Sequence, residues 1–149
     1  MTGTSQLYRL TPEGWPYQLT FFPNGVSGYN LSNDLRTIAV TAAVGGAERF
    51  QIFLLDAESG LTRQITINPD ARFSVPLFSP DDRKIYYSGN PDSPTDFYIY
   101  EQELSSGSVR TVHEREGLNA VGDLTDDGRF LLLYHTISNT DNDLYVLDL

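Results

Sequence analysis

The sequence predicts an all-β fold built from repeated four-stranded units. A short polar turn occurs three times, the copies lie 47 and 46 residues apart, and an apolar run follows each copy. The turns are Ser32–Arg36, Ser79–Arg83 and Thr125–Arg129. Three glycines, Gly14, Gly60 and Gly107, repeat with nearly the same period. A period of about 40–50 residues made of short strands is the spacing of β-propeller blades.

Each complete unit is expected to hold four strands. A first strand such as Phe73–Phe78 leads into the polar turn, a second strand follows the turn, and a third strand follows a variable loop. The third strands are expected at Gln51–Asp56, Tyr98–Glu101 and Leu144–Asp148, and closing strands after each glycine at Tyr17–Thr20, Arg63–Thr66 and Arg110–His113. Tyr, Phe, Val, Ile, Leu and Thr fill these segments, and β-branched and aromatic residues favour strands.

The second strands are almost continuously apolar at Ile38–Val40, Ile85–Tyr87 and Phe130–Tyr134. Such runs indicate strands that are covered on both faces, as blades are when they pack against their neighbours. We therefore expect the equivalent residues Ile38, Ile85 and Leu131 to be buried. Pro76, within an expected first strand, indicates a sheet edge or a bulge, because proline cannot donate a ladder hydrogen bond.

The units divide the chain into a partial propeller over residues 1–149. Residues 1–27 supply opening strands, 28–67 and 73–112 supply one blade each, and 118–149 supply a blade without its closing strand. Propellers typically close with 4–8 blades, so about three blades make an incomplete ring. We expect either a piece of a larger propeller or self-assembly through open blade edges. In the second case Tyr17–Thr20 of one copy would complete the last blade of another, and two arcs would give six blades.

Composition excludes several classes of partner. The chain has 20 acidic and ten basic residues and a net charge of −10, whereas binding to phosphate backbones requires a basic face. No run approaches the about 18–20 apolar residues of a membrane span. The N-terminal residues lack the basic and apolar segments of a secretory signal, and there is no cysteine. We expect a cytoplasmic protein that binds neither nucleic acid nor membrane.

The turn carboxylates of Asp34, Asp81 and Asp126, with Asp82 and Asp127 beside two of them, are expected to be structural. Aspartate at such positions accepts hydrogen bonds from backbone amides two residues on and holds the turn. Each turn ends in an arginine, and the three are Arg36, Arg83 and Arg129. We expect each arginine to form a weak surface ion pair with the carboxylates of its turn.

No catalytic or metal-binding pattern emerges from the sequence. There is no Gly-x-Ser-x-Gly nucleophile elbow and no zinc ligand set, and the two histidines, His113 and His135, lie at strand positions where hydrogen-bonded structural roles are common. The segment Thr140–Asp143 alternates carboxylates like a calcium loop but lacks its glycine and distant glutamate, which favours a plain hairpin loop. We expect no catalytic residue, no metal and no cofactor in this chain.

The loop pair Glu48 and Arg49 is the one candidate for ligand or substrate contact. Binding residues tend to lie on loops that a rigid scaffold positions. The alternative for both residues is a solvated hairpin tip.

The second unit carries a family resemblance. Its Ser-Pro-Asp turn, its aromatic third strand ending in an acidic residue, and its Ser-Gly-x-x-Arg closure resemble blades in the N-terminal propellers of the prolyl oligopeptidase family of serine peptidases, which includes acylaminoacyl peptidases. The opening segment, residues 6–22, is similar to the start of many such propellers. The same blade pattern also occurs in Tol-type propellers.

The resemblance implies a gate and not a catalyst. In that family the propeller covers a separate α/β-hydrolase domain, which carries the Ser-His-Asp triad, and restricts access to short peptides. We therefore expect a non-catalytic propeller segment, with the remaining blades or a hydrolase domain of a serine peptidase as partner. The alternative is a stand-alone interaction module that binds a protein or small ligand.

Overall fold

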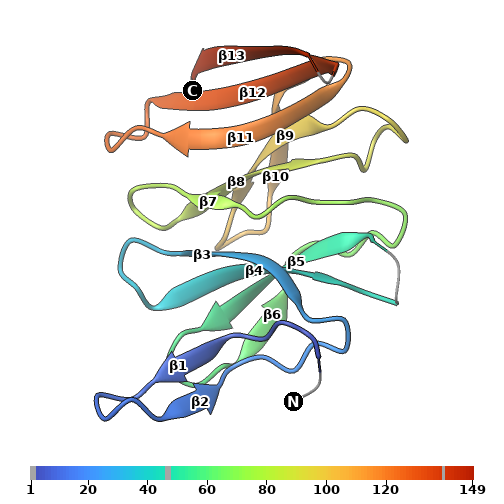
Figure 1. Ribbon diagram of the computed structural model, residues 1–149. Helices are drawn as coiled ribbons and strands as arrows, with labels where there is room; N and C mark the ends of the chain where they lie inside the picture. The colour runs from blue at the N-terminus through green and yellow to red at the C-terminus, as the bar shows by residue number, and fades with distance from the viewer. Residues whose placement is uncertain (1–2, 46–47, 139) are drawn as a thin grey trace.

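The computed structural model describes residues 3–45, 48–138 and 140–149, which form four antiparallel sheets stacked in chain order (Figure 1). The two-stranded half-blade is β1 (Tyr8–Leu10) and β2 (Pro16–Gln18). The first blade is β3 (Val26–Leu31), β4 (Thr37–Ala43), β5 (Phe50–Asp56) and β6 (Thr62–Gln64). The second blade is β7 (Leu77–Phe78), β8 (Lys84–Gly89), β9 (Tyr98–Glu103) and β10 (Val109–His113). The third blade is β11 (Leu118–Leu124), β12 (Phe130–Ser138) and β13 (Asp141–Asp148).

Within each blade the strands pair in the order of the sequence, so the chain meanders outward from the first strand. The expected all-β propeller fold is confirmed. The three marker glycines all have positive φ, at 85°, 75° and 76° for Gly14, Gly60 and Gly107. That conformation is strained for other residues, which explains why glycine repeats at the turn before each closing strand.

The polar turns share one hydrogen-bond pattern. The hydroxyl of Ser32 donates to Asp34 at 2.7 Å, and Asp34 accepts the amide of Arg36 at 2.9 Å. The pairs Ser79–Asp81 and Thr125–Asp127 repeat the first bond, each at 2.6 Å. These hydroxyl bonds are the largest cause that lowers the pKa of all three aspartates. Of the two neighbouring carboxylates expected in the third turn, Asp127 takes this role and Asp126 does not, because Asp127 lies two residues after the hydroxyl.

The arginines that end the turns do not behave alike. Arg83 lies 3.9 Å from Asp81, and both side chains are exposed. Arg129 instead pairs with Asp148 at the end of β13, with its Nη2 at 3.0 Å and Nε at 3.1 Å from the carboxylate. The strand pairing of Phe130 with Asp148 brings those two side chains together. The ion pair of Arg129 is therefore with Asp148, and its charge is only a minor cause of the lowered pKa of the turn carboxylate Asp127.

One turn carboxylate joins two blades. Asp82 of the second blade accepts hydrogen bonds from the backbone amides of Asn33 and Asp34 in the first blade, at 2.8 and 2.9 Å. Asp82 adopts a φ of 57°, which the short polar side chain of aspartate tolerates better than most. The equivalent residue of the third blade, Gly128, lies against Pro80 of the second. The turns therefore help to fix how successive blades stack.

The core lies between the sheets in three clusters. One lies between the half-blade and the first blade, one between the first and second blades, and one between the second and third. Ile85 and Leu131 are 0% exposed and Ile38 is 8% exposed, which confirms the predicted equivalence of these positions. Burial of β4 and β8 is continuous through their centres, as expected for strands covered on both faces.

The strand β12 differs from that expectation. Leu131 and Leu133 are buried against the second blade, but Tyr134 is 47% exposed on the opposite face. Successive strand residues point to opposite faces, and no sheet among the described residues covers the outer face of β12 and β13. The continuous apolar run therefore marks a face that is open in this chain.

Pro76 lies immediately before β7, and β7 is an edge strand with only two residues, which confirms the edge position. The expected strand Phe73–Phe78 is interrupted, and only an isolated bridge joins Phe73 to Gly89. At the other end of the chain, β1 and β2 pair with each other and form a separate layer under the first blade (Figure 1). Among the described residues no helix is long and apolar enough to cross a membrane.

Candidate functional site

An open pocket lies where the first strands of the three blades meet. We call it the inner pocket, and its volume is about 480 Å³. This lies within the usual range of about 300–1,000 Å³ for small-molecule sites. Its lining comes from all three blades: Ser27, Thr41, Phe50, Arg72, Phe73, Ser74, Val75, Ser88, Phe97, Leu118, Asn119 and Ala120. Arg72 is the one charged side chain in this lining.

Backbone contacts within and between blades hold the walls of the inner pocket together. Phe97, which precedes β9, forms a parallel bridge with Leu118 of β11, and its amide donates to the carbonyl of Gly117 at 2.9 Å. In the second blade, Ser74 donates its amide to the carbonyl of Ser88 at 2.8 Å. The strands β3, β7 and β11 accordingly lie one above another (Figure 1). The pocket is a product of blade stacking and not of one loop.

A buried polar cluster supports the third-blade wall. His135 is 4% exposed, and its Nδ1 lies 2.8 Å from Oδ1 of Asn119. The side-chain Nδ2 of Asn119 donates to the carbonyls of Phe97 and Arg115 at 2.8 and 2.7 Å. Burial and the charge of Arg115 lower the pKa of nearby His113. In the part of the chain that the structure describes, neither histidine forms a hydrogen bond with a serine or a carboxylate.

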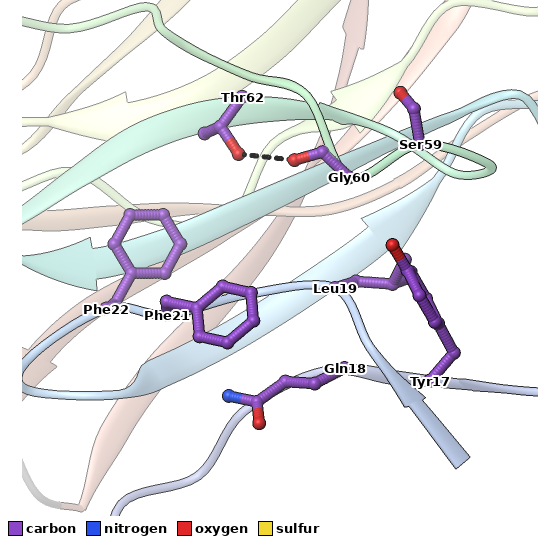
Figure 2. Close-up of a pocket in the computed structure, with 8 residues that line it drawn as sticks. All are labelled: Tyr17, Gln18, Leu19, Phe21, Phe22, Ser59, Gly60 and Thr62. Carbon is purple, nitrogen blue, oxygen red and sulfur yellow. Dashed lines mark hydrogen bonds between the residues drawn. The ribbon is translucent and has the colours of Figure 1, made fainter.

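A second pocket, which we call the rim pocket, lies between the segment after β2 and the turn that joins β5 to β6 (Figure 2). Its volume is about 590 Å³. Its lining is Tyr17, Gln18, Leu19, Phe21, Phe22, Ser59, Gly60 and Thr62. Figure 2 shows the Phe21 and Phe22 rings on one side and the hydroxyls of Ser59 and Thr62 on the other. The rim pocket has no charged lining residue, so the inner pocket is the better candidate for a specific site.

The predicted contact residues Glu48 and Arg49 lie outside both pockets. Arg49 donates from Nη1 to the carboxylate of Asp70 at 2.7 Å and to the carbonyl of Pro69 at 2.9 Å. Its guanidinium therefore ties the loop before β5 to the segment that joins the first and second blades. Glu48 is exposed just before β5. Their role in ligand contact stays a prediction.

Arg72 is the pocket residue that sequence reasoning missed. Val26, Phe73 and Asn119 hold equivalent positions in the three blades, as their strand partners show. The residue before each is therefore also equivalent: Gly25 in the first blade, Arg72 in the second and Leu118 in the third. The signal in the sequence that could have identified Arg72 is its charge, because the equivalent residues of the other two units are uncharged.

The most strongly perturbed carboxyl group lies between the second and third blades. Glu101 accepts hydrogen bonds from Arg110 at 2.8 and 2.9 Å, from Tyr86 at 2.9 Å and from Lys84 at 3.2 Å. Its side chain is only 8% exposed. The bond from Arg110, followed by those from Tyr86 and Lys84, lowers the pKa of Glu101 to about 2. A carboxylate with so low a pKa is a structural anion and a poor general base near neutral pH.

The segment expected as a hairpin loop, Thr140–Asp143, is shorter in the structure because β13 already begins at Asp141. Asp143 accepts a hydrogen bond from the hydroxyl of Tyr145 at 2.8 Å. The described residues contain no group of three or more His, Cys, Asp or Glu side chains that could hold a metal ion.

Solved structures match most of this chain. A prolyl endopeptidase structure matches 96% of it with a TM-score of 0.76 and 23% identity, and a putative TolB from Agrobacterium tumefaciens matches 96% with a TM-score of 0.76 and 25% identity. An oligogalacturonate lyase matches 96% with a TM-score of 0.71 and 14% identity. No protein-family model and no curated protein matches the sequence.

These matches identify the fold as propeller-like. The chain spans 24% of the prolyl endopeptidase chain, 51% of the TolB chain and 39% of the lyase chain. A peptidase, a TolB and a lyase share the fold, so the likeness fixes the architecture and leaves the activity to be argued from the site.

Proposed function

We propose that this chain is a non-catalytic propeller segment of a prolyl-oligopeptidase-like serine peptidase, in which it gates substrate access and packs on a hydrolase domain. The observation that carries the proposal is the arc of blades around the inner pocket, lined by one exposed cation and by hydroxyl and aromatic side chains. The blade pattern of the second unit and the structural likeness to a prolyl endopeptidase support it. The catalytic groups would come from the hydrolase domain.

The second candidate is a stand-alone interaction module. The inner pocket favours it, because a pocket built from three blades can hold a ligand without a hydrolase domain. Determining the complete reading frame around this segment separates the two. Further blades and a Gly-x-Ser-x-Gly motif in the same frame support the peptidase segment. A frame that encodes these blades without a hydrolase domain supports the module.

The purified chain is expected to show no peptidase or esterase turnover. Acyl transfer needs a serine that a histidine activates and a carboxylate that orients the histidine. Hydrolysis of a chromogenic dipeptide and of a chromogenic ester should stay at the rate of buffer alone. Turnover that co-purifies with the chain and is abolished by a serine-reactive inhibitor would contradict the proposal.

Both ends of the arc expose apolar side chains. On the third blade Tyr134 pairs with Leu144 across the ladder, and Val146 lies on the same face of the sheet. Their exposed fractions are 47%, 63% and 68%. At the other end the half-blade exposes Tyr8, Leu10, Trp15 and Tyr17. Exposed apolar faces of this kind mark packing surfaces, and we propose that another blade covers each of them.

The isolated chain is therefore expected to self-associate at micromolar concentration, measured by light scattering after gel filtration. The sequence predicts six blades for two arcs, but β1 and β2 pair with each other and form a separate sheet. Two arcs would therefore occupy eight blade positions, the upper end of the usual 4–8. Val146→Lys should weaken association because it places a charge on the open face. Val109→Lys, also exposed but on β10, should leave it unchanged. A chain that stays monomeric at tens of micromolar would contradict this prediction.

A further inference from the structure

The inner pocket contains a cation without an acidic partner. Arg72 forms no ion pair within the described ranges, and the nearest acidic residue in the sequence, Asp70, is held by Arg49 at 2.7 Å. The Arg72 guanidinium lies over the ring of Phe50, 5.3 Å from its centroid. Stacking on an aromatic face leaves the edge N–H groups of a guanidinium free to donate. Arg72 is thus positioned to bind an anion.

A serine hydroxyl that forms no hydrogen bond with the described residues lies in the same pocket. Ser88 of β8 is 3% exposed, and its backbone is fixed because its amide donates to Oγ of Ser74 at 2.9 Å. The Oγ of Ser88 itself makes no hydrogen bond to any residue that the structure describes, although it belongs to the pocket lining. The group is available for a polar atom of a ligand.

Apolar walls complete the pocket. They are formed by Phe73, Val75, Phe97 and Leu118. Two glycines let these side chains lie close to the sheet. A Cβ on Gly28 would lie 2.4 Å from Cγ2 of Val75, and a Cβ on Gly89 would lie 2.5 Å from Cδ1 of Phe73. The side chains of Val75 and Phe73 are therefore packed against the backbone of Gly28 and Gly89, and these walls of the pocket have defined positions.

We propose that the inner pocket binds a small carboxylate attached to an apolar or aromatic group, such as the C-terminal residue of a short peptide. Arg72 would donate to the carboxylate, Ser88 would donate a further hydrogen bond, and the apolar body would contact Phe73 and Phe97. One cation in a chain of net charge −10 suits a monoanion with an apolar body better than a phosphate dianion. This inference does not depend on the proposed role in a peptidase.

The test is calorimetric titration of the purified chain with N-acetylphenylalanine, with N-acetylphenylalaninamide as the neutral match and inorganic phosphate as the bare anion. Saturable binding of the acid is expected, with the amide and phosphate at least ten-fold weaker. Arg72→Gln should weaken binding of the acid about 10- to 100-fold, because a hydrogen bond to a charged group is lost. Ser88→Ala should weaken it about three- to ten-fold.

The control variant is Arg63→Gln, which removes an exposed arginine on β6, outside the inner pocket, and should leave binding unchanged. Arg72 is exposed, so its variant should fold and decides the question if Ser88→Ala does not. Three results would each overturn the proposal: no saturable binding of the acid, equal binding of the acid and the amide, or full binding by Arg72→Gln. Phosphate that binds as well as the acid would overturn the assignment of an apolar body.

Discussion

Glu101→Gln is expected to lower the free energy of unfolding by about 2–3 kcal/mol at neutral pH. A pKa depressed from 4.5 to about 2 corresponds to roughly 1.4 kcal/mol per unit, or about 3 kcal/mol. The substitution leaves Arg110 and Lys84 without their carboxylate, but both are partly exposed and can regain water. That relief keeps the loss below the roughly 3–5 kcal/mol typical of a broken buried pair.

The same group makes stability depend on pH in a defined direction. The folded pKa of Glu101 lies below the unfolded value, so the native state binds fewer protons. Its contribution is fully present above about pH 4.5 and is lost as the pH falls through about 2. Turn aspartates with lowered pKa values add to the acid loss in both proteins. The difference between wild type and Glu101→Gln should therefore shrink as the pH falls from 5 to 2.

Urea denaturation at several pH values measures both effects. Glu103→Gln is the matched control, because Glu103 lies two residues further along β9 and forms no ion pair in the described part of the chain. It should change the unfolding free energy by no more than about 0.5 kcal/mol. A Glu101→Gln protein that is as stable as wild type at pH 7 would show that the buried cluster contributes nothing. A difference that persists undiminished at pH 2 would show that the loss does not come from the charge of Glu101.

The repeat of the blades could be predicted from the sequence because each residue that marks it is required by the local backbone of a turn. Gly60 and Gly107 recur where the turn needs positive φ, and Ser79 with Asp81 recur where a hydroxyl and a carboxylate close the turn. Contacts between blades were not readable in this way. Asp82 reaches the turn of the first blade 49 residues earlier, and nothing local marks that partner.

The candidate site was harder to predict because it combines residues that are far apart in the sequence. The sequence directed attention to the loop residue Arg49, which the structure pairs with Asp70. The charged residue in the pocket is Arg72. The nearby Asp70 is already paired with Arg49, and the Arg72 guanidinium stacks on Phe50 without an acidic partner. The apolar run of β12 does not by itself identify its open face, because such a run looks the same whether its cover lies inside this chain or outside it. The count of about three blades is what predicts an open face at the end of the arc.

Ile85→Ala is expected to destabilise the chain by about 4–5 kcal/mol, near the upper end of the range for buried isoleucine. Ile85 is 0% exposed at the centre of the second blade and belongs to the cluster that also contains Ala39, Ile52 and Leu54 of the first blade. Four-stranded sheets flank this cluster on both sides. The cavity left by truncation can close only if two complete sheets move together, so little of the loss should be recovered.

Ile38→Ala tests the same argument at the equivalent position of the first blade, where one of the two flanking layers is smaller. Ile38 is 8% exposed, and its cluster is closed on one side by the two-stranded half-blade through Leu19. That layer can shift more easily into the space, so a smaller loss of about 2–3 kcal/mol is expected. Leu61→Ala, at a side chain that is 76% exposed, should change stability by less than about 0.5 kcal/mol. Urea denaturation of the three variants measures the order of their unfolding free energies. A loss of unfolding free energy for Ile38→Ala equal to or above that for Ile85→Ala would contradict the layered packing.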